Sequence, residues 1–445
     1  MNTTLALKKH LSPFQIIILG FAGVILLGTI LLMLPISSVQ RVITPFSQAL
    51  FTSVSAVCVT GLVVYDTATY WSYFGQLVIL ILIQIGGMGV ITVAVFIAII
   101  SGKKISLMQR STMQEAISAF QMGGIVKMTY FIIKGCFLVE FIGACLMMPV
   151  FCNDFGIKGI WMAIFHSISA FCNAGFDIMG STNNQFASLT VYQGVVWINF
   201  VVMLLIVIGG IGFLTWSDIL ANRNHFHKYR MQSKVIIATT LILIIIPALY
   251  FFIKEFNNMP ITERVLSSLF QAITPRTAGF NTVDMNIISS TGRALIIILM
   301  LIGGSPGSTA GGMKTTTIAV LFANMMSIAR RNEYAYYFGR RIDNSIVRNA
   351  STLLFMYLTL FISGAFIISI VENIDMGLCL FETASAIGTV GLSLGITPGL
   401  HLISKLVLIA LMFFGRVGGL TMIFATGRKV HHIYGKLPQE KITVG

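Results

Sequence analysis

Long apolar runs dominate this sequence and restrict the chain to the folds of integral membrane proteins. A bilayer crossing needs about 20 apolar residues. Runs of suitable length occur at 14–35, 74–100, 130–151, 195–214, 235–252, 294–329, 352–371 and 402–425. Only 10% of the 445 residues are charged, against about 25% in soluble domains. Too few charges remain to cover a water-facing surface, so we expect eight spans and an outer surface that mostly faces lipid.

The charged residues between these runs predict the orientation of the chain. Lysine and arginine gather in short stretches at 8–9, 103–110, 223–234 and 330–348 and again after 428. The other connections carry Asp66, Asp154, Asp177, Glu255, Glu263, Asp284, Glu372 and Asp375. Basic loops stay in the cytoplasm, so both termini are expected there. Basic cytoplasmic loops beside anionic membrane lipid therefore account for the net charge of +14, and we expect no nucleic-acid partner.

Four shorter, semi-polar segments lie between successive pairs of apolar runs and resemble one another. Each starts with an apolar residue and Phe, continues with small or polar residues, and reaches a Gly that precedes Leu or Phe. They cover 50–62, 164–176, 269–280 and 380–392. The apolar run after each segment carries a second motif: IGGMG, IGGIG, IGGSPG or FGRVGG. Two motifs that share one period and one order indicate a fourfold repeat.

The repeat predicts the fold class and the domain organisation. We divide the chain into repeats at 1–110, 111–225, 226–340 and 341–445, the last with a cytoplasmic tail. Each repeat is a span, a re-entrant pore loop and a second span. The expected fold is therefore an all-α polytopic membrane protein with four sequential span–pore-loop–span repeats around one central ion pore.

The four pore loops point to ion conduction. Non-helical backbone at membrane depth survives only inside protein or beside a water-filled cavity. A ring of backbone carbonyls can replace the hydration shell of a cation, and uncharged ligands favour a large monovalent ion over calcium or magnesium. The alternative for any single glycine is close helix packing. The candidate ion-binding residues are Val59, Thr60, Gly61, Asn173, Ala174, Gly175, Thr277, Ala278, Gly279, Thr389, Val390 and Gly391.

The sixth apolar run is too long for one straight span, and glycine and proline interrupt its middle. Each glycine costs a helix about 1 kcal/mol and a proline about 3 kcal/mol. We therefore predict two half-helices joined by an intramembrane loop below the pore loops, which would obstruct the pore; the alternative is a plain cytoplasmic turn. The candidate gate residues are Gly303, Gly304, Ser305, Pro306, Gly307, Ser308, Thr309, Ala310, Gly311, Gly312 and Lys314.

A few charged residues fall inside the apolar or pore segments. Arg416 replaces the second glycine of the motif that reads GG in the other repeats, and an arginine at membrane depth is a functional candidate. It is expected to hold the loop closed through carbonyl hydrogen bonds or to set an electrostatic barrier, the alternative being a buried ion pair. For Arg276 and Glu382, beside the third and fourth pore loops, we expect a structural ion pair or a brace of the filter.

The motifs resemble the membrane subunit of Ktr-type potassium uptake systems, within the Trk/Ktr/HKT superfamily. The resemblance runs from residue 14 to 425 and rests on TGL at 60–62, NAGF at 173–176, TPRTAGF at 274–280, IGGSPGSTAGGMK at 302–314 and FGRVGGLT at 414–421. It implies a potassium pore with one glycine per filter loop, an intramembrane gating loop and a bacterial plasma membrane location. It also implies a homodimer on a cytoplasmic ring of nucleotide-binding regulatory subunits. Glycine at position 61, where some relatives carry serine and pass more sodium, favours potassium.

Three functions remain open at this point. The first is potassium translocation, with sodium as a possible activator or coupled ion. The second is a sodium-selective or sodium-coupled transporter of the same architecture. The third is a membrane-embedded enzyme, which is disfavoured because the chain lacks an H-E-x-x-H motif or paired intramembrane carboxylates. No nucleotide-binding motif or cofactor site is expected in this chain, so the basic stretches at 223–234 and 330–348 and the tail after 428 are candidate contacts for a regulatory partner.

Overall fold

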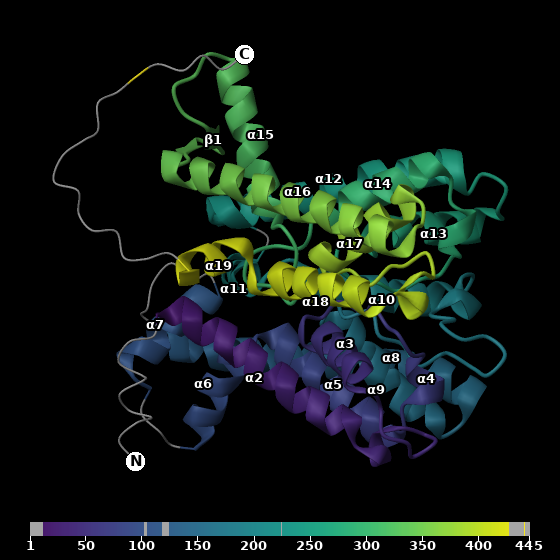
Figure 1. Cartoon of the computed structure of the whole chain (residues 1–445). Helices are drawn as coiled ribbons and strands as arrows, with labels where there is room; N and C mark the ends of the chain where they lie inside the picture. Colours follow the sequence, from purple (N-terminus) through teal and green to yellow (C-terminus); the bar gives the residue numbers. More distant parts are fainter. Residues whose placement is uncertain (1–11, 102–104, 118–123, 224, 427–439, 441–445) are drawn as a thin grey trace.

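The computed structural model describes residues 12–101, 105–117, 124–223, 225–426 and 440, and this part of the chain is mostly helical (Figure 1). The basic residues at 8–9 and 103–104 and the tail from 428 to 439 lie outside the described residues. Four successive units follow one another along the chain. Each consists of a long helix, a short helix and a helix that is bent or broken.

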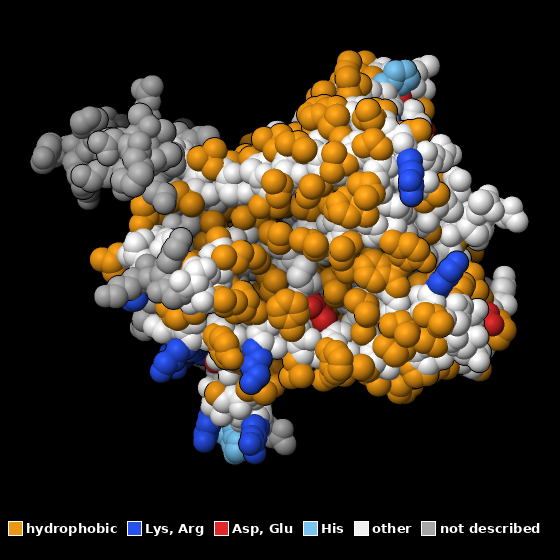
Figure 2. Space-filling view, turned by 90° about the horizontal axis from the view of Figure 1, so that it is seen from below, with side chains coloured by type: hydrophobic (Ala, Val, Ile, Leu, Met, Phe, Trp, Pro, Cys, Tyr) orange, Lys and Arg blue, Asp and Glu red, His pale blue; other side chains and the backbone are white. Residues whose placement is uncertain are grey.

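The first helix of each unit is long, and most of its surface faces outward. These helices are α2 (Pro13–Met33), α8 (Ile125–Phe155), α12 (Met231–Tyr250) and α16 (Asn344–Glu372). Between 28% and 39% of each apolar window is buried. The uncovered side chains are apolar, as the face in Figure 2 shows, and such a surface suits lipid tails rather than water.

The second helix of each unit is too short to cross a bilayer and is enclosed by protein. These helices are α3 (Phe46–Val57), α9 (Lys158–Phe171), α13 (Ile261–Ile273) and α17 (Met376–Gly388). Each ends in an uninterrupted stretch of buried residues just before a pore-loop glycine. Their small residues permit this close enclosure, since bulky side chains would hold the surrounding helices apart.

The third element of each unit departs from the expectation of uninterrupted spans. We expected only the sixth apolar run to be broken, and that expectation is wrong. The pairs α5 (Tyr73–Met88) and α6 (Val90–Ile100), α10 (Val196–Gly210) and α11 (Phe213–Asn222), and α18 (Leu402–Val417) and α19 (Gly419–Thr426) bend by 96°, 98° and 93°. Within the described residues, four helices are long enough to span, or seven elements if each bent pair counts as one.

Glycine is the physical reason for the three bends. Gly89, Gly212 and Gly418 stand at the breaks with φ of 86°, 91° and 91°, a region that side chains rarely tolerate. Each belongs to the motif that follows the pore loop, and the next helix starts directly after it. The same motif was visible in the sequence as a repeat marker.

The sixth run is divided as expected, into α14 (Ser290–Leu301) and α15 (Thr315–Ala329). The segment between them is non-helical and closes on itself, because Ile302 and Met313 form a parallel β-bridge. The smaller elements are α4 (Thr67–Tyr70), α7 (Leu107–Ala116), β1 (Tyr336–Tyr337), β2 (Arg340–Arg341), the π-turn Phe251–Glu255 and the 3-10 turns Pro35–Ser37, Thr190–Tyr192, Phe226–Lys228, Met285–Ile287 and Thr397–Gly399.

Contacts between the units close into a ring. The bent or broken helix of each unit packs against the short helix of the next: α5 on α9, α10 on α13, α14 on α17 and, completing the cycle, α18 on α3. A cyclic order of this kind places the ends of the four short helices around one axis. The core of the molecule therefore surrounds a central axis.

We expect alanine at Gly212 to destabilise the protein more than alanine at Gly418. Both substitutions force a side chain into a φ of 91°, which costs about 1–3 kcal/mol. Only at Gly212 does the new Cβ also meet a neighbour, the Pro306 carbonyl oxygen at 2.6 Å, whereas no described atom lies within 4 Å at Gly418. Thermal unfolding in detergent measures the difference, and equal melting temperatures would contradict this account.

Candidate ion pore

The structure brings the four pore-loop glycines into one closed ring. A Cβ built on each glycine would meet the carbonyl oxygen of the middle residue of the next loop. The pairs are Gly61 with Ala174 at 2.5 Å, Gly175 with Ala278 at 2.8 Å, Gly279 with Val390 at 2.2 Å, and Gly391 with Thr60 at 2.3 Å. Backbone therefore touches backbone around the whole ring, and no side chain fits between neighbouring loops.

Each loop uses two left-handed residues, of which the sequence indicated only the glycine. The glycines have φ between 66° and 96°, and the residue two positions earlier is also left-handed: Val59 at 56°, Asn173 at 57°, Thr277 at 75° and Thr389 at 52°. Asparagine tolerates this conformation, but valine and threonine do so rarely. Each such residue costs about 1–3 kcal/mol, so surrounding contacts must hold the loops in place.

A hydroxyl group at the same position of every short segment supplies such contacts. In the first and fourth loops, Ser55 and Ser385 accept a hydrogen bond from the glycine N–H at 3.1 and 3.0 Å. In the second and third loops, Ser169 and Thr274 donate to the carbonyl of the Phe after the glycine at 2.6 and 2.7 Å. This role was not predicted, although the aligned segments carry Ser, Ser, Thr and Ser at one matched position.

Several polar side-chain atoms of the tripeptides are buried without a hydrogen-bond partner. In the described part of the chain these include the hydroxyls of Thr60, Thr277 and Thr389 and the Oδ1 of Asn173. Buried polar atoms in proteins are otherwise satisfied by protein or water. Unpaired oxygens at the ring suit a site that a partly dehydrated cation or water occupies.

A vestibule of about 600 Å³ opens above the ring and has an acidic lining. All four glycines line its floor, and Asp66, Asp177 and Asp284 line its walls. Burial raises the pKa of Asp177 to about 7, and the nearby Asp66 charge adds to the effect, while the backbone N–H groups of Met179 and Ser188 oppose it. Carboxylates around a mouth raise the local cation concentration.

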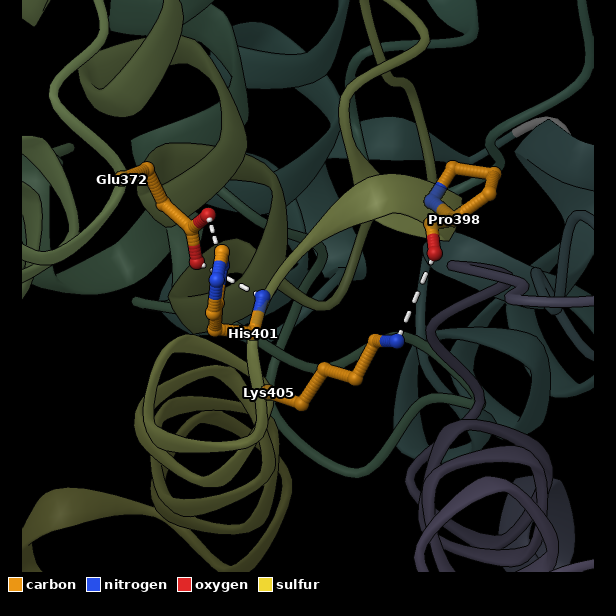
Figure 3. Close-up of polar contacts among 4 residues, drawn as sticks. All are labelled: Glu372, Pro398, His401 and Lys405. Atoms are coloured by element: carbon orange, nitrogen blue, oxygen red, sulfur yellow. Dashed lines mark hydrogen bonds and ion pairs between the residues drawn. The ribbon is translucent and has the colours of Figure 1, made fainter.

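Hydrogen bonds position the part of the vestibule wall that the fourth unit contributes (Figure 3). Glu372, at the end of α16, accepts from the backbone N–H of His401 at 2.8 Å and pairs with its ring Nδ1 at 2.8 Å. One turn later, Lys405 donates to the Pro398 carbonyl at 3.4 Å. Because Pro398 lines the vestibule, these contacts anchor its wall to the surrounding helices.

Glu382 and Arg276 do not pair with each other or with another charged side chain in the described residues. The Glu382 carboxylate accepts hydrogen bonds from Ser393 at 2.9 Å and from Thr397, so it braces the segment that leaves the fourth candidate pore loop. Arg276 reaches only the Thr240 hydroxyl, at 3.5 Å. We expected an ion pair or a brace for both residues. Glu382 forms a brace, and neither residue forms an ion pair within the described residues.

The intramembrane loop lies directly against the inner end of the ring. Asn173 donates through Nδ2 to the Thr309 hydroxyl at 2.9 Å. A Cβ on Gly311 would stand 2.1 Å from the Thr389 hydroxyl. The loop therefore touches the first residue of two of the candidate tripeptides, and its glycines allow this close approach.

The loop is also hydrogen-bonded to the broken helices of the neighbouring units. Ser305 N–H donates to the Gly210 carbonyl at 2.9 Å, and Gly312 N–H donates to the Gly415 carbonyl at 3.1 Å. Arg416 donates to the Thr309 carbonyl on one side and to Gly86 and Gly87 on the other, the last at 3.1 Å. One guanidinium thus links the fourth unit, the loop and the first unit.

Lys314 places a second cationic side chain beside Arg416. Its ammonium group donates to the carbonyls of Ala310 and Gly311 at 2.9 and 3.3 Å. Both side chains line a cavity of about 240 Å³ that also includes Gly87, Met313 and Tyr357. Two positive groups therefore stand below the ring, on the opposite side from the acidic vestibule.

Comparison with known proteins agrees with this geometry. Residues 6–432 match the family model described as cation transport protein, TrkH. The chain belongs to the TrkH family of cation transport proteins. It is therefore an integral membrane protein of a cation-transporter family rather than of an enzyme family, and the resemblance to the Trk/Ktr/HKT proteins is confirmed.

Individual proteins that are similar to this chain agree with the family assignment. The chain is 41% identical to the potassium/sodium uptake protein NtpJ of Enterococcus hirae over 98% of both chains. It is 37% identical to Ktr system potassium uptake protein B of Bacillus subtilis over 93% of both chains. The crystal structure of the potassium transporter TrkH from Vibrio parahaemolyticus superposes with a TM-score of 0.71 at 21% identity, over 92% of this chain and 84% of that one. The expected all-α polytopic fold is thus confirmed.

Alanine at Gly279 should abolish cation flux, whereas alanine at Gly395 should leave most of it. The two positions share a left-handed backbone, with φ of 79° and 91°, so the strain of the substitution is similar. The Cβ at Gly279 would lie 2.2 Å from the Val390 carbonyl oxygen, while no described atom lies within 4 Å of the one at Gly395. Rubidium uptake into liposomes at matched protein content measures the effect; equal losses in both variants would argue against a tightly closed ring.

Proposed function

We propose that the chain translocates potassium across the cell membrane through a selectivity filter built from its four pore loops. The single observation that carries this proposal is the closed ring of glycines, each against the carbonyl of the next loop. Such a ring offers uncharged oxygens at fixed spacing to a dehydrated monovalent ion. Two similar proteins are named for potassium uptake, which supports the choice of ion.

The path of the ion follows from the electrostatics around the ring. The acidic vestibule gathers cations. The four short helices end at the filter loops, and the negative ends of their dipoles favour a cation there. The filter residues are the tripeptides 59–61, 173–175, 277–279 and 389–391, whose oxygens replace the water that the ion gives up. Below them the ion meets the intramembrane loop.

We assign the loop 303–314 and Arg416 to the gate. The loop lies against Asn173 and Thr389 at the inner end of the filter, where it stands in the way of the ion. Arg416 holds it through the Thr309 carbonyl, and its charge, together with that of Lys314, opposes a cation. Opening requires the loop to leave these partners. Hydrogen bonds to a charged donor contribute about 1.5–3 kcal/mol each, an amount that a regulatory partner can supply.

A regulatory partner is part of this proposal. The relative from Bacillus subtilis is named as a component of a Ktr system. We propose a cytoplasmic, nucleotide-binding regulatory ring and a homodimer of this chain, with both termini on the cytoplasmic side. The basic stretches 223–234 and 330–348 are the candidate contacts. The tail after 428, the third candidate, lies outside the described residues.

Sodium transport is the second candidate function. The relative from Enterococcus hirae is named a potassium/sodium uptake protein, which favours a role for sodium as a transported, coupled or activating ion. Position 61 is glycine, so all four loops present the same backbone to the ion. That uniformity favours potassium, and the flux ratio separates the two functions.

Ion flux in liposomes tests the choice of ion. With the purified protein, potassium and rubidium are expected to pass at least about tenfold faster than sodium, because a rigid carbonyl ring replaces the shell of the larger ions better. Addition of sodium on the same side tests activation or coupling. Equal passage of the three ions would favour the sodium-transport alternative.

Replacement of Arg416 separates its hydrogen bonds from its charge. Arg416→Gln removes both and should raise resting potassium flux about tenfold, since a charge-assisted bond present only in the closed state is lost. Arg416→Lys keeps the charge but cannot bridge Thr309 and Gly86 together, so an intermediate rise indicates a latch and no rise indicates a charge barrier. Deletion of 303–312 should raise flux further; unchanged flux in the deletion would refute the gate.

A further inference from the structure

A projecting part of the structure, outside the pore, carries a cleft of about 260 Å³. Its lining includes Phe322, Met326, Arg330, Tyr336 and Phe338. The cleft lies between the last turns of α15 and the hairpin of β1 and β2, which stand apart from the main bundle in Figure 1. We refer to it as the hairpin cleft. No contact of the filter or of the intramembrane loop explains its composition.

The helix beside the hairpin cleft presents an uncovered apolar stripe. Phe322, Met325 and Ile328 are 53%, 55% and 68% exposed. Their spacing of three residues places them on one face of α15. Large apolar side chains in a row are costly in water, so an apolar medium or partner covers this stripe in the working protein.

The hairpin itself is held firmly enough to form a defined wall. The Tyr337 hydroxyl donates to the Ala319 carbonyl of α15 at 2.9 Å. A small separate core of Ala323, Ala335 and Ile342 fills the space between helix and hairpin. Tyr336 and Phe338 remain 47% and 51% exposed beside it. Amphipathic aromatic side chains of this kind favour the level of lipid headgroups.

Positive charge exceeds negative charge around the hairpin cleft. Arg330, Arg331, Arg340, Arg341 and Arg348 fall in this stretch with only Glu333 and Asp343. None of these arginines forms an ion pair within the described residues. Instead, Arg341 stacks over Tyr334 at 3.4 Å, and Lys234 from α12 lies 5.8 Å from the Phe338 ring centre. The lining of the cleft itself has Arg330 and aromatic side chains but no carboxylate.

We propose that the hairpin cleft binds the headgroup phosphate of an anionic phospholipid, whose acyl chains lie along the apolar stripe of α15. Arg330 at the cleft and Arg340 on the hairpin supply the charge, Tyr336 and Phe338 flank the headgroup, and Phe322, Met325 and Ile328 meet the chains. The apolar stripe continues directly into the basic cleft, which matches the order of chain and headgroup in a lipid. This assigns Arg330 and Arg340 to lipid and leaves the rest of the basic stretches as candidate contacts for the regulatory partner.

Native mass spectrometry of the delipidated protein titrated with phosphatidylglycerol or phosphatidylcholine tests the site. The wild type is expected to retain phosphatidylglycerol in preference to phosphatidylcholine. Arg330→Gln combined with Arg340→Gln should weaken phosphatidylglycerol retention by roughly fivefold per arginine, as expected for a basic residue near an anionic lipid. Arg110→Gln, an exposed arginine on α7 away from the hairpin, serves as the matched control.

Three results would overturn the proposal. The first is unchanged phosphatidylglycerol retention in the double variant, and the second is an equal loss in the Arg110 control. The third is a change of oligomeric state or of regulator binding without a change in lipid retention, which would assign the surface to a protein partner. Melting temperatures check that the double variant is folded. Rubidium flux in phosphatidylcholine liposomes reports on the filter separately, so a failure of the ion proposal remains distinguishable.

Discussion

The close approach of four backbone segments around one axis is the constraint on which the rest of the structure depends. A carbonyl oxygen of each loop lies where a side chain on the neighbouring glycine would be. The ring therefore has to be held from outside, because its loops contain left-handed valine, threonine and asparagine that would relax if they were free. Enclosed short helices, hydroxyl braces and the cyclic packing of unit against unit provide that support.

The breaks in the third element of each unit also help to hold the ring in place. A straight helix at that place would present only side chains to the axis, because its carbonyls are used internally. Where the helix breaks, carbonyls become free, and the intramembrane loop and Arg416 use those of Gly86, Gly87, Gly210 and Gly415. Three helix bends and the loop that divides the sixth run thus form a single hydrogen-bonded layer below the ring, which couples the units to one another.

Much of this architecture was predictable from the sequence, because glycine and proline act locally. The repeat, the pore loops and the division of the sixth run follow from Gly61 and its counterparts and from Pro306. The bends at Gly89, Gly212 and Gly418 were not predicted, since an apolar run looks the same whether or not its helix continues. The partners of Glu382 and Ser55 lie only 11 and 6 residues away along the chain. These pairings depend on how the loop folds back on its short helix, and apolar periodicity carries no information about that geometry.

The cyclic packing has a consequence for how the protein is made. The short helix of the first unit rests on α18, which belongs to the last unit. When the first loop leaves the ribosome, the wall that completes it has not yet been synthesised. The ring can close only after the fourth unit has been synthesised, so the segments inserted earlier stay in the bilayer with strained loops unsupported. A chain truncated before the fourth unit would therefore keep an open ring, however many of its segments had already been inserted, and would be a substrate for membrane-protein quality control.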